Sequence, residues 1–357
     1  MKVRNTVVWF LLAFFSVTPG GLAVGKYAVT KRVVEGHPTY HLLDARRKMD
    51  FGLVPDIGNF GYEFKVNGKD VFIPPESFKS YLEKRWFCCG NPFLAPWANR
   101  IDQDYYYFRD KKYLLNDALG NLLRDQFKQV IHGLLVFDPR WEVVKTSASD
   151  TQGAFITSRF EFYKYPDLMA QFPFAHTLDV THRLKDGKLE VTTAVSNVGR
   201  APMPVMMAYH PYFRPDGDRE EWTVSNAARN TWVLNDHLTP TGEKESTEKL
   251  MPDAKNFQLG KTFLDNLFSD LERGPDGLAR FWVKGKSQKV EVVYGKEFGF
   301  AVIYAPLPPN EPLICIEPQT GPTNAFNLNH DGKFPGLVAL EPGKVFKASF
   351  WIVPSGF

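Results

Sequence analysis

The chain has 357 residues, of which 44% are hydrophobic, 15% aromatic and 23% charged. This composition supplies enough apolar material for a large core and excludes an intrinsically disordered chain. The formal net charge of +3 is small, and no cluster of Lys and Arg follows the aromatic residues along the sequence. We therefore expect no nucleic-acid partner.

The first 23 residues are typical of a secretory signal peptide. Lys2 and Arg4 precede an apolar run at residues 7–17, and small residues follow up to Ala23. A membrane anchor is the alternative, but the run is shorter than the ~20 apolar residues that a spanning helix needs. We predict that residues 1–23 are removed and that the mature protein is secreted or periplasmic, without stable membrane insertion.

Residues 24–357 contain no linker rich in Ser, Gly or Pro and no run of charge, which favours a single domain. The cysteines Cys88, Cys89 and Cys315 are odd in number, and two of them are adjacent. This pattern argues against a disulfide framework. Cys315 is expected to be a thiol in the core. The sequence leaves the oligomeric state open.

In chain order, the first periodic segment is residues 114–127, where apolar residues recur at near-helical spacing and Gly120 interrupts the pattern. The later segments are rich in β-branched or aromatic residues and are predicted to be strands. They are residues 155–163, 178–184, 189–198, 289–294, 300–304, 313–317 and 345–353. Asp186 and Gly187 form a hairpin signal between two of them. The sequence therefore predicts an all-β protein, a large antiparallel β-sandwich.

Nucleotide and metal signatures are absent from the sequence. It contains no Gly-rich loop opening a helix, no His-Glu-x-x-His and no Cys-x-x-Cys, so we expect no cofactor and no metal. Ser77 and Ser225 lack the Gly-x-Ser-x-Gly elbow of serine hydrolases. Any chemistry is expected to use side chains alone.

Several polar residues stand within apolar or aromatic runs, and they are the candidates for that chemistry. Glu317 ends the apolar run of residues 313–316, where a buried carboxylate must be either paired or used. The other residues of this kind are Asn99, Arg100, His132, His210 and Asp265.

The segments around these residues resemble ordered landmarks of the aldose 1-epimerase (galactose mutarotase) family. They are residues 93–101 (FLAPWANRI), 131–133 (IHG), 209–213 (YHPYF), 264–268 (LDNLF) and 315–320 (CIEPQT), and residues 238–243 (LTPTGE) add a further likeness. The resemblance covers residues 58–357 and implies a β-sandwich of supersandwich type. It departs from the best-known members at Tyr209 and Pro211, where those carry Asn and Ser.

The resemblance also implies a role for each candidate residue. Glu317 would be the general base and His210 the general acid of anomer interconversion. Substrate ligands would be His132, Arg100 and Asp265, with Asn99 beside them. The reaction removes a proton from the C1 hydroxyl of a sugar and gives one to the ring oxygen, so it needs an acid and a base at once. It involves no redox step, and the implied partner is a small sugar.

Each of these residues also has a purely structural interpretation. Glu317 could form a salt bridge at a strand end, and Arg100 could pair with Asp102 or Asp104. His210 could belong to an aromatic core, His132 could cap a turn and Asp265 could lie in a turn. The remaining aromatic candidates are Trp97, Trp141 and Trp222, for which core packing is favoured over stacking on a sugar.

The other histidines are not favoured as catalysts. Strand alternation places His176 and His182 on the same face as their apolar neighbours, so His182 is expected in the core. His37, His41, His237 and His330 lie in polar, turn-rich surroundings and are expected on the surface.

The sequence thus favours an exported aldose 1-epimerase acting on a free hexose or a related sugar. One alternative is a non-catalytic carbohydrate-binding protein on the same fold. A glycan-active hydrolase or lyase is another, and a hydrolase would need Asp265 as a second carboxylate. A hexose-phosphate mutarotase is the last, and it would need Arg100 together with Arg140 and Arg214 around the phosphate.

Overall fold

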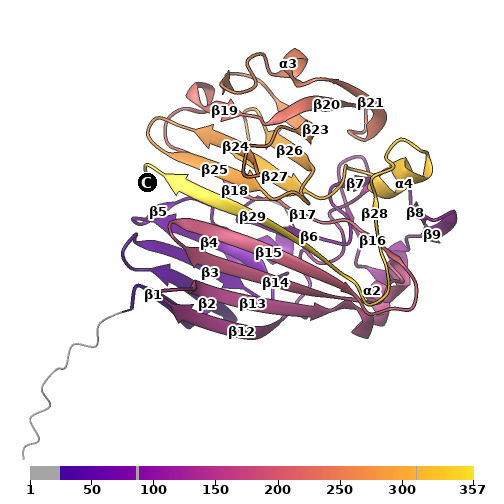
Figure 1. Cartoon of the computed structure of the whole chain (residues 1–357), viewed down its shortest axis with the longest axis horizontal. Coiled ribbons are helices and arrows are strands. Elements are labelled where there is room, and N and C mark those ends of the chain that lie inside the picture. Colours follow the sequence, from indigo (N-terminus) through magenta and orange to yellow (C-terminus); the bar gives the residue numbers. More distant parts are fainter. Residues whose placement is uncertain (1–24, 86–87, 311) are drawn as a thin grey trace, which may run out of the picture.

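The computed structural model describes residues 25–85, 88–310 and 312–357, so the predicted signal peptide lies outside the described residues. Strands make up 48% of the structure and helices 10%. All pairings between its named strands are antiparallel, and Figure 1 shows the strands stacked across the molecule with short helices at its margins. The prediction of an all-β, antiparallel fold is confirmed.

The largest sheet has nine strands and runs through the middle of the molecule in Figure 1. Its strands, in spatial order, are β12 (Glu142–Ser149), β13 (Gly153–Glu161), β14 (His176–Lys185), β15 (Lys188–Asn197), β29 (Val345–Ser355), β25 (Lys289–Tyr294), β24 (Ala279–Lys284), β19 (Thr223–Ser225) and β22 (Phe257–Gln258). The turn between β14 and β15 has φ of 50° at Asp186 and 81° at Gly187, as the predicted Asp-Gly hairpin requires.

A second sheet has eight strands and carries the functional residues. Its order is β21 (Pro240–Ser246), β20 (Ala228–Leu234), β23 (Leu264–Leu271), β26 (Phe300–Ala305), β27 (Ile314–Gln319), β17 (Ala208–Tyr209) and β6 (Phe93–Leu94), with β18 (Tyr212–Phe213) also paired to β27. Every residue of β27 is buried, so this strand lies inside the protein on both faces. Its burial explains why the sequence shows an unbroken apolar run there.

A five-stranded meander forms the third sheet, at the N-terminal side of the molecule in Figure 1. It consists of β1 (Tyr27–Val34), β2 (His37–Asp44), β3 (Met49–Val54), β4 (Phe60–Val66) and β5 (Lys69–Asp70). The short strands are β7 (Arg100–Ile101), β8 (Tyr105–Phe108), β9 (Lys111–Leu114), β10 (Leu123–Arg124), β11 (Val130–Ile131), β16 (Met203–Val205) and β28 (Val338–Leu340). The helices are α1 (Phe78–Lys84), α2 (Pro166–Gln171), α3 (Thr247–Leu250) and α4 (Ala325–His330), with 3₁₀ turns η1 (Asp117–Leu119), η2 (Phe162–Lys164) and η3 (Arg219–Glu221).

The helical pattern at residues 114–127 does not form a helix. The segment holds the 3₁₀ turn η1, which the Asn116 side chain caps and Gly120 ends at φ 69°, and the two-residue strand β10. Leu115 is buried in the core, but Leu114 and Leu119 are 69% and 38% exposed, so the apolar residues of this segment do not form one buried face that would stabilise a helix. Among the described residues, no helix is long and apolar enough to cross a membrane.

The core joins the two large sheets. In β14 and β15 every second residue is buried, which is the alternation of strands with one face on a core. Trp97, Trp141 and Trp222 are buried in this core, as packing residues. His182 is also buried and stacks on Phe51 with ring centroids 5.1 Å apart.

His41 was expected on the surface, and that prediction is wrong. It lies in β2 and is 1% exposed. Strand alternation turns its side chain toward Tyr62, whose hydroxyl lies 2.9 Å from His41 Nε2 and satisfies the buried imidazole.

Candidate active site

Glu317 and His210 face each other across neighbouring strands. Strand β17 pairs Ala208 with Gln319, and β18 pairs Tyr212 with Cys315. The same register, extended through the gap between β17 and β18, places His210 directly opposite Glu317. His210 Nε2 lies 3.2 Å from Glu317 Oε1, and both side chains are buried.

The gap between β17 and β18 follows from the sequence. Pro211 and Pro318 have no backbone N–H and cannot donate to the ladder. The His210 N–H instead donates to the Pro92 carbonyl oxygen at 3.1 Å, and the Tyr212 N–H donates to that of Gly90 at 2.9 Å. Residues 90–92 therefore hold the segment around His210 where that segment separates from β27. These bonds fix His210 although it does not lie in a regular strand.

Arg100 stands at the start of β7 with its guanidinium bound on three sides. Nε donates to Asp125 Oδ2 at 2.6 Å, Nη2 to Asp265 Oδ2 at 3.4 Å and Nη1 to Asn99 Oδ1 at 3.1 Å. The structural alternative that named Asp102 or Asp104 as its partner is wrong. Asp102 accepts from Asn327 Nδ2 and Asp104 from Arg124 Nη2.

His132 follows β11 in a left-handed conformation with φ of 62°. Its backbone N–H donates to the Asn99 carbonyl oxygen at 3.0 Å, and the next residue, Gly133, bridges to Ala95. A Cβ on Gly133 would lie 2.2 Å from the Ala95 carbonyl oxygen, so only glycine fits there. This close approach explains the His-Gly sequence and sets the His132 ring edge-on to that of His210, with centroids 5.4 Å apart.

Asp265 lies in strand β23 and not in a turn. It pairs with Tyr304 of β26, which in turn pairs with Cys315 of β27. Because Cys315 and Glu317 are two residues apart on one strand, Asp265 faces the same side of the sheet as Glu317. Asn99, at φ 52°, uses its carboxamide oxygen on the backbone N–H and the guanidinium of Arg100, so it holds that side chain in place.

A cavity of about 530 Å³ opens over this face of the sheet. All of the residues singled out from the sequence line it: Asn99, Arg100, His132, His210, Asp265 and Glu317. This volume lies within the ~300–1,000 Å³ of typical small-molecule sites. The sequence-based site residues are thus brought together in one cavity, although they are spread over more than half of the chain.

The cavity also has walls that sequence reasoning missed. These residues are Arg85, Arg124, Asp125, Gln126, Ile131, Tyr212, Leu238, Phe263 and Tyr304. Asp125 is the most consequential, because its side chain is only 3% exposed and binds Arg100. A buried arginine signals that a carboxylate partner exists, but the sequence does not say which of the acidic residues it is. Phe263, which is 48% exposed, offers an aromatic face at the cavity wall.

Burial drives the site histidines and Glu317 toward their neutral forms. Burial, with a contribution from the nearby charge of Asp265, raises the pKa of Glu317 well above its usual range. Burial lowers the pKa of His210 to about 3. The pKa of His132 is also lowered, first by burial and then by His210 and Arg100. We conclude that Glu317 and His210 hold one proton between them over a wide pH range.

Asp265 is affected in the same direction. Burial raises the pKa of its carboxyl group, while the guanidinium of Arg100 acts against that rise. The cavity floor is therefore a low-dielectric surface on which each charge depends on a named partner.

Arg140 and Arg214, which a phosphate site would require, do not line the cavity. Arg140 binds the carboxylates of Asp138 and Asp167, and Arg214 donates to the Pro312 carbonyl oxygen. The arginines at the cavity are Arg85, Arg100 and Arg124, and two of these are held by aspartates.

The fold is that of a galactose mutarotase-like β-protein. The structure is similar to that of a galactose mutarotase-like protein from Clostridium acetobutylicum, with a TM-score of 0.81, 20% identity and coverage of 93% of this chain and 99% of that chain. It is also similar to galactose 1-epimerase from Lactobacillus acidophilus, with a TM-score of 0.72, 15% identity and coverage of 93% and 99%. A galactose mutarotase-like protein from Lactobacillus casei gives a TM-score of 0.66, with 16% identity and coverage of 92% and 100%.

The aldose 1-epimerase family model matches residues 60–352. The chain therefore belongs to the aldose 1-epimerase family, and the resemblance seen in its sequence is confirmed. Family and fold support a mutarotase-like function in which the ligand is a sugar.

Proposed function

We propose that this protein is an exported aldose 1-epimerase that interconverts the α and β anomers of a free hexose or a related sugar. The observation that carries the proposal is the buried pair of His210 Nε2 and Glu317 Oε1, 3.2 Å apart at the floor of the cavity. Export is proposed from the N-terminal sequence alone.

In the proposed reaction the pair acts in its ionised form, with Glu317 as carboxylate and His210 as imidazolium. Glu317 takes the proton of the C1 hydroxyl while His210 gives a proton to the ring oxygen, so the bond between C1 and the ring oxygen breaks. The open-chain aldehyde turns about its C1–C2 bond. On ring closure at the other face, Glu317 gives its proton to the C1 oxygen and His210 takes the proton of the hydroxyl group that closes the ring. The roles of acid and base are thus reversed, and the pair returns to its starting form.

This cycle leaves the number of protons on the pair unchanged. The neutral and ionised forms of the pair also hold the same single proton, so a shift of that proton between Oε1 and Nε2 is sufficient to prepare the reactive form. The hydroxyl groups of a bound sugar would form hydrogen bonds to the charged groups and would favour the ionised form.

The remaining polar residues are proposed to bind the sugar. Arg100 offers fixed donors, because its aspartate partners hold the guanidinium. A neutral His132 can donate to or accept from a hydroxyl group. Asp265 accepts, and Asn99 maintains the position of Arg100.

Polarimetry tests the proposal. Freshly dissolved α-D-glucose and α-D-galactose should reach their equilibrium rotation faster with the wild-type protein than with buffer. Glu317→Gln should lower the rate by about 10²-fold or more, because it removes the base. Glu243→Gln, the same substitution at an exposed strand position, should leave the rate unchanged. Equal rates in wild type and Glu317→Gln would refute the proposal.

A further inference from the structure

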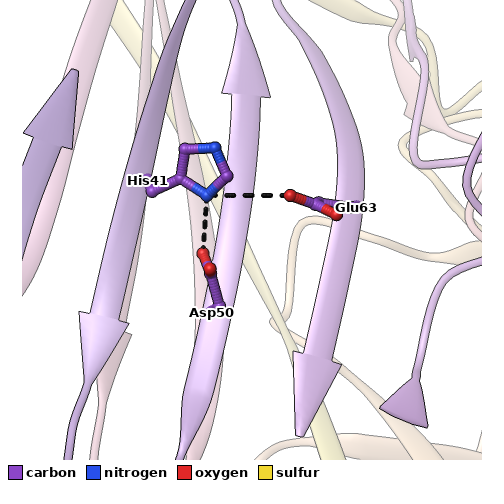
Figure 2. A group of neighbouring side chains, drawn as sticks. All are labelled: His41, Asp50 and Glu63. Carbon is purple, nitrogen blue, oxygen red and sulfur yellow. Dashed lines mark hydrogen bonds and ion pairs between the residues drawn. The ribbon is translucent and has the colours of Figure 1, made fainter. Parts of the chain in front are cut away.

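Three side chains converge on the five-stranded sheet, outside the residues that line the cavity (Figure 2). His41 Nδ1 lies 2.7 Å from Asp50 Oδ1 and 3.7 Å from Glu63 Oε1. The three ligand atoms lie within 4.8 Å of one another. They come from the neighbouring strands β2, β3 and β4.

The strand pairing explains why these groups meet. His41 pairs with Gly52, and Gly52 pairs with Glu63, so His41 and Glu63 flank a glycine in one cross-strand row. A bulge next to Gly52 sets both Tyr62 and Glu63 against this one position. A Cβ on Gly52 would lie 2.8 Å from the Tyr62 ring and 2.9 Å from Glu63 Cγ. Glycine therefore provides the room in which both side chains turn toward His41.

The imidazole is oriented from its other nitrogen. The Tyr62 hydroxyl lies 2.9 Å from His41 Nε2, and His41 is 1% exposed. A hydrogen bond at the second nitrogen is the arrangement that commonly fixes the ring of a metal-binding histidine. Nδ1 is thereby left to face two carboxylates.

One proton on Nδ1 cannot serve both carboxylates. It can form a hydrogen bond to Asp50 at 2.7 Å, whereas 3.7 Å to Glu63 is too long for a hydrogen bond. Lys65 Nζ contacts the other oxygen of Glu63, Oε2, at 2.5 Å and Asp70 at 3.8 Å. The ammonium group of Lys65 thus contacts two carboxylates and lies near the charge of a third, Asp50, while Glu63 Oε1 remains directed at His41. The local charge favours a cation.

We propose that His41 Nδ1, Asp50 and Glu63 bind a divalent transition-metal ion, for which Zn²⁺ is the matching probe. Zinc bonds of ~2.0–2.2 Å in tetrahedral geometry separate their donor atoms by about 3.4 Å. The distances of 2.7 and 3.7 Å from His41 Nδ1 bracket this value, and all three donor atoms lie within 4.8 Å of one another, so metal binding requires side-chain adjustments and no movement of the strands. Asp50 is 30% exposed, which leaves the outer side open to a water ligand. The ion would cross-link three strands and would take no part in the sugar reaction.

Titration calorimetry of the tag-free mature protein, treated with EDTA and dialysed into metal-free buffer, tests this proposal. We expect one equivalent of Zn²⁺ to bind and the melting temperature to rise with added Zn²⁺. Glu63→Gln and Asp50→Asn should each weaken binding at least tenfold. These variants leave the buried imidazole in place, which protects the fold. His37→Gln is the matched control, because His37 lies on the same strand but pairs with Asp56.

Substitution with Co²⁺ provides a second readout. A four-coordinate Co²⁺ spectrum should develop with the wild type at one equivalent and be absent with Glu63→Gln. The proposal is overturned if no stoichiometric Zn²⁺ binding occurs, or if both carboxylate variants bind as the wild type does. Ca²⁺ binding as tight as that of Zn²⁺ would also overturn it, because carboxylates without a nitrogen ligand would then explain the site.

Discussion

Asp125→Asn should destabilise the protein through Arg100. The two side chains are 3% and 7% exposed and are joined by a contact of 2.6 Å. The other carboxylate oxygen of Asp125 accepts the backbone N–H groups of Phe127 and Gln129, each at 2.9 Å. An Asn that keeps these bonds with its oxygen turns its NH₂ group toward Arg100, so that two donors face each other.

The magnitude follows from the burial of the pair. Removal of one partner from a buried ion pair costs about 3–5 kcal/mol. Arg100 retains Asp265 at 3.4 Å, which offsets part of the loss. We therefore expect the free energy of unfolding to fall by about 3 kcal/mol, near the lower end of that range.

Urea denaturation followed by tryptophan fluorescence measures this loss. Asp117→Asn is the matched control, because Asp117 is 63% exposed and pairs with Arg124 in solvent, so its substitution should lower the free energy of unfolding far less. If Arg100 binds sugar as proposed, Asp125→Asn should also raise the KM measured by polarimetry. A tenfold rise in KM would correspond to a loss of about 1.4 kcal/mol of binding free energy. Equal destabilisation by both variants would refute the reasoning.

Three further predictions concern pH and backbone geometry. The kcat/KM for anomer interconversion, corrected for the spontaneous reaction, should stay flat between pH 4.5 and 7, because the pair takes up a second proton only near the lowered pKa of His210, about 3. An acid limb centred near 6.5 would contradict this. Glu317→Gln should raise the free energy of unfolding in urea at pH 7 but not below pH 4.5. The pKa of Glu317 is higher in the folded than in the unfolded protein, so the wild type loses stability as pH rises from the unfolded pKa toward the folded one. Gly133→Ala should lower the free energy of unfolding by about 2–4 kcal/mol, because the added methyl group strains the backbone and overpacks the site. Gly120→Ala, at φ 69° with no atom within 4 Å of the added Cβ, should cost less in the same denaturation assay.

The part of the site that lies on a single strand could be predicted from the local sequence. The apolar run ending at Glu317 marked a buried strand, and β27 is buried throughout. Resemblance then supplied His210 and Arg100, and the cavity contains both. The partner of Arg100 could not be found in this way, because Asp125 lies in a loop and reaches the guanidinium only when β7, β10 and β11 pair.

His41 shows the same limit from another direction. Its polar, turn-rich surroundings in the sequence favoured a surface position, whereas the strand pairing of β2 with β3 buries the imidazole. Asp50 and Glu63 approach it only across three strands, and a bulge decides which side chains face Gly52. Cross-strand contacts of this kind leave no spacing motif in a single sequence, so only the folded structure reveals them.

The position of the Glu317 and His210 pair depends on backbone register more than on the two side chains. Continuation of one register through the gap between β17 and β18 sets the residues opposite each other, and Tyr212 stacks on His210 with ring centroids 4.6 Å apart. Loss of strand hydrogen bonds at Pro211 and Pro318 frees this part of the sheet from the ladder, and residues 90–92 hold it from the other side. A slip of one residue between the two segments would place His210 and Glu317 on opposite faces of the sheet. The surrounding core, which makes such a slip costly, is therefore what keeps an acid and a base 3.2 Å apart in a site that burial alone would disfavour.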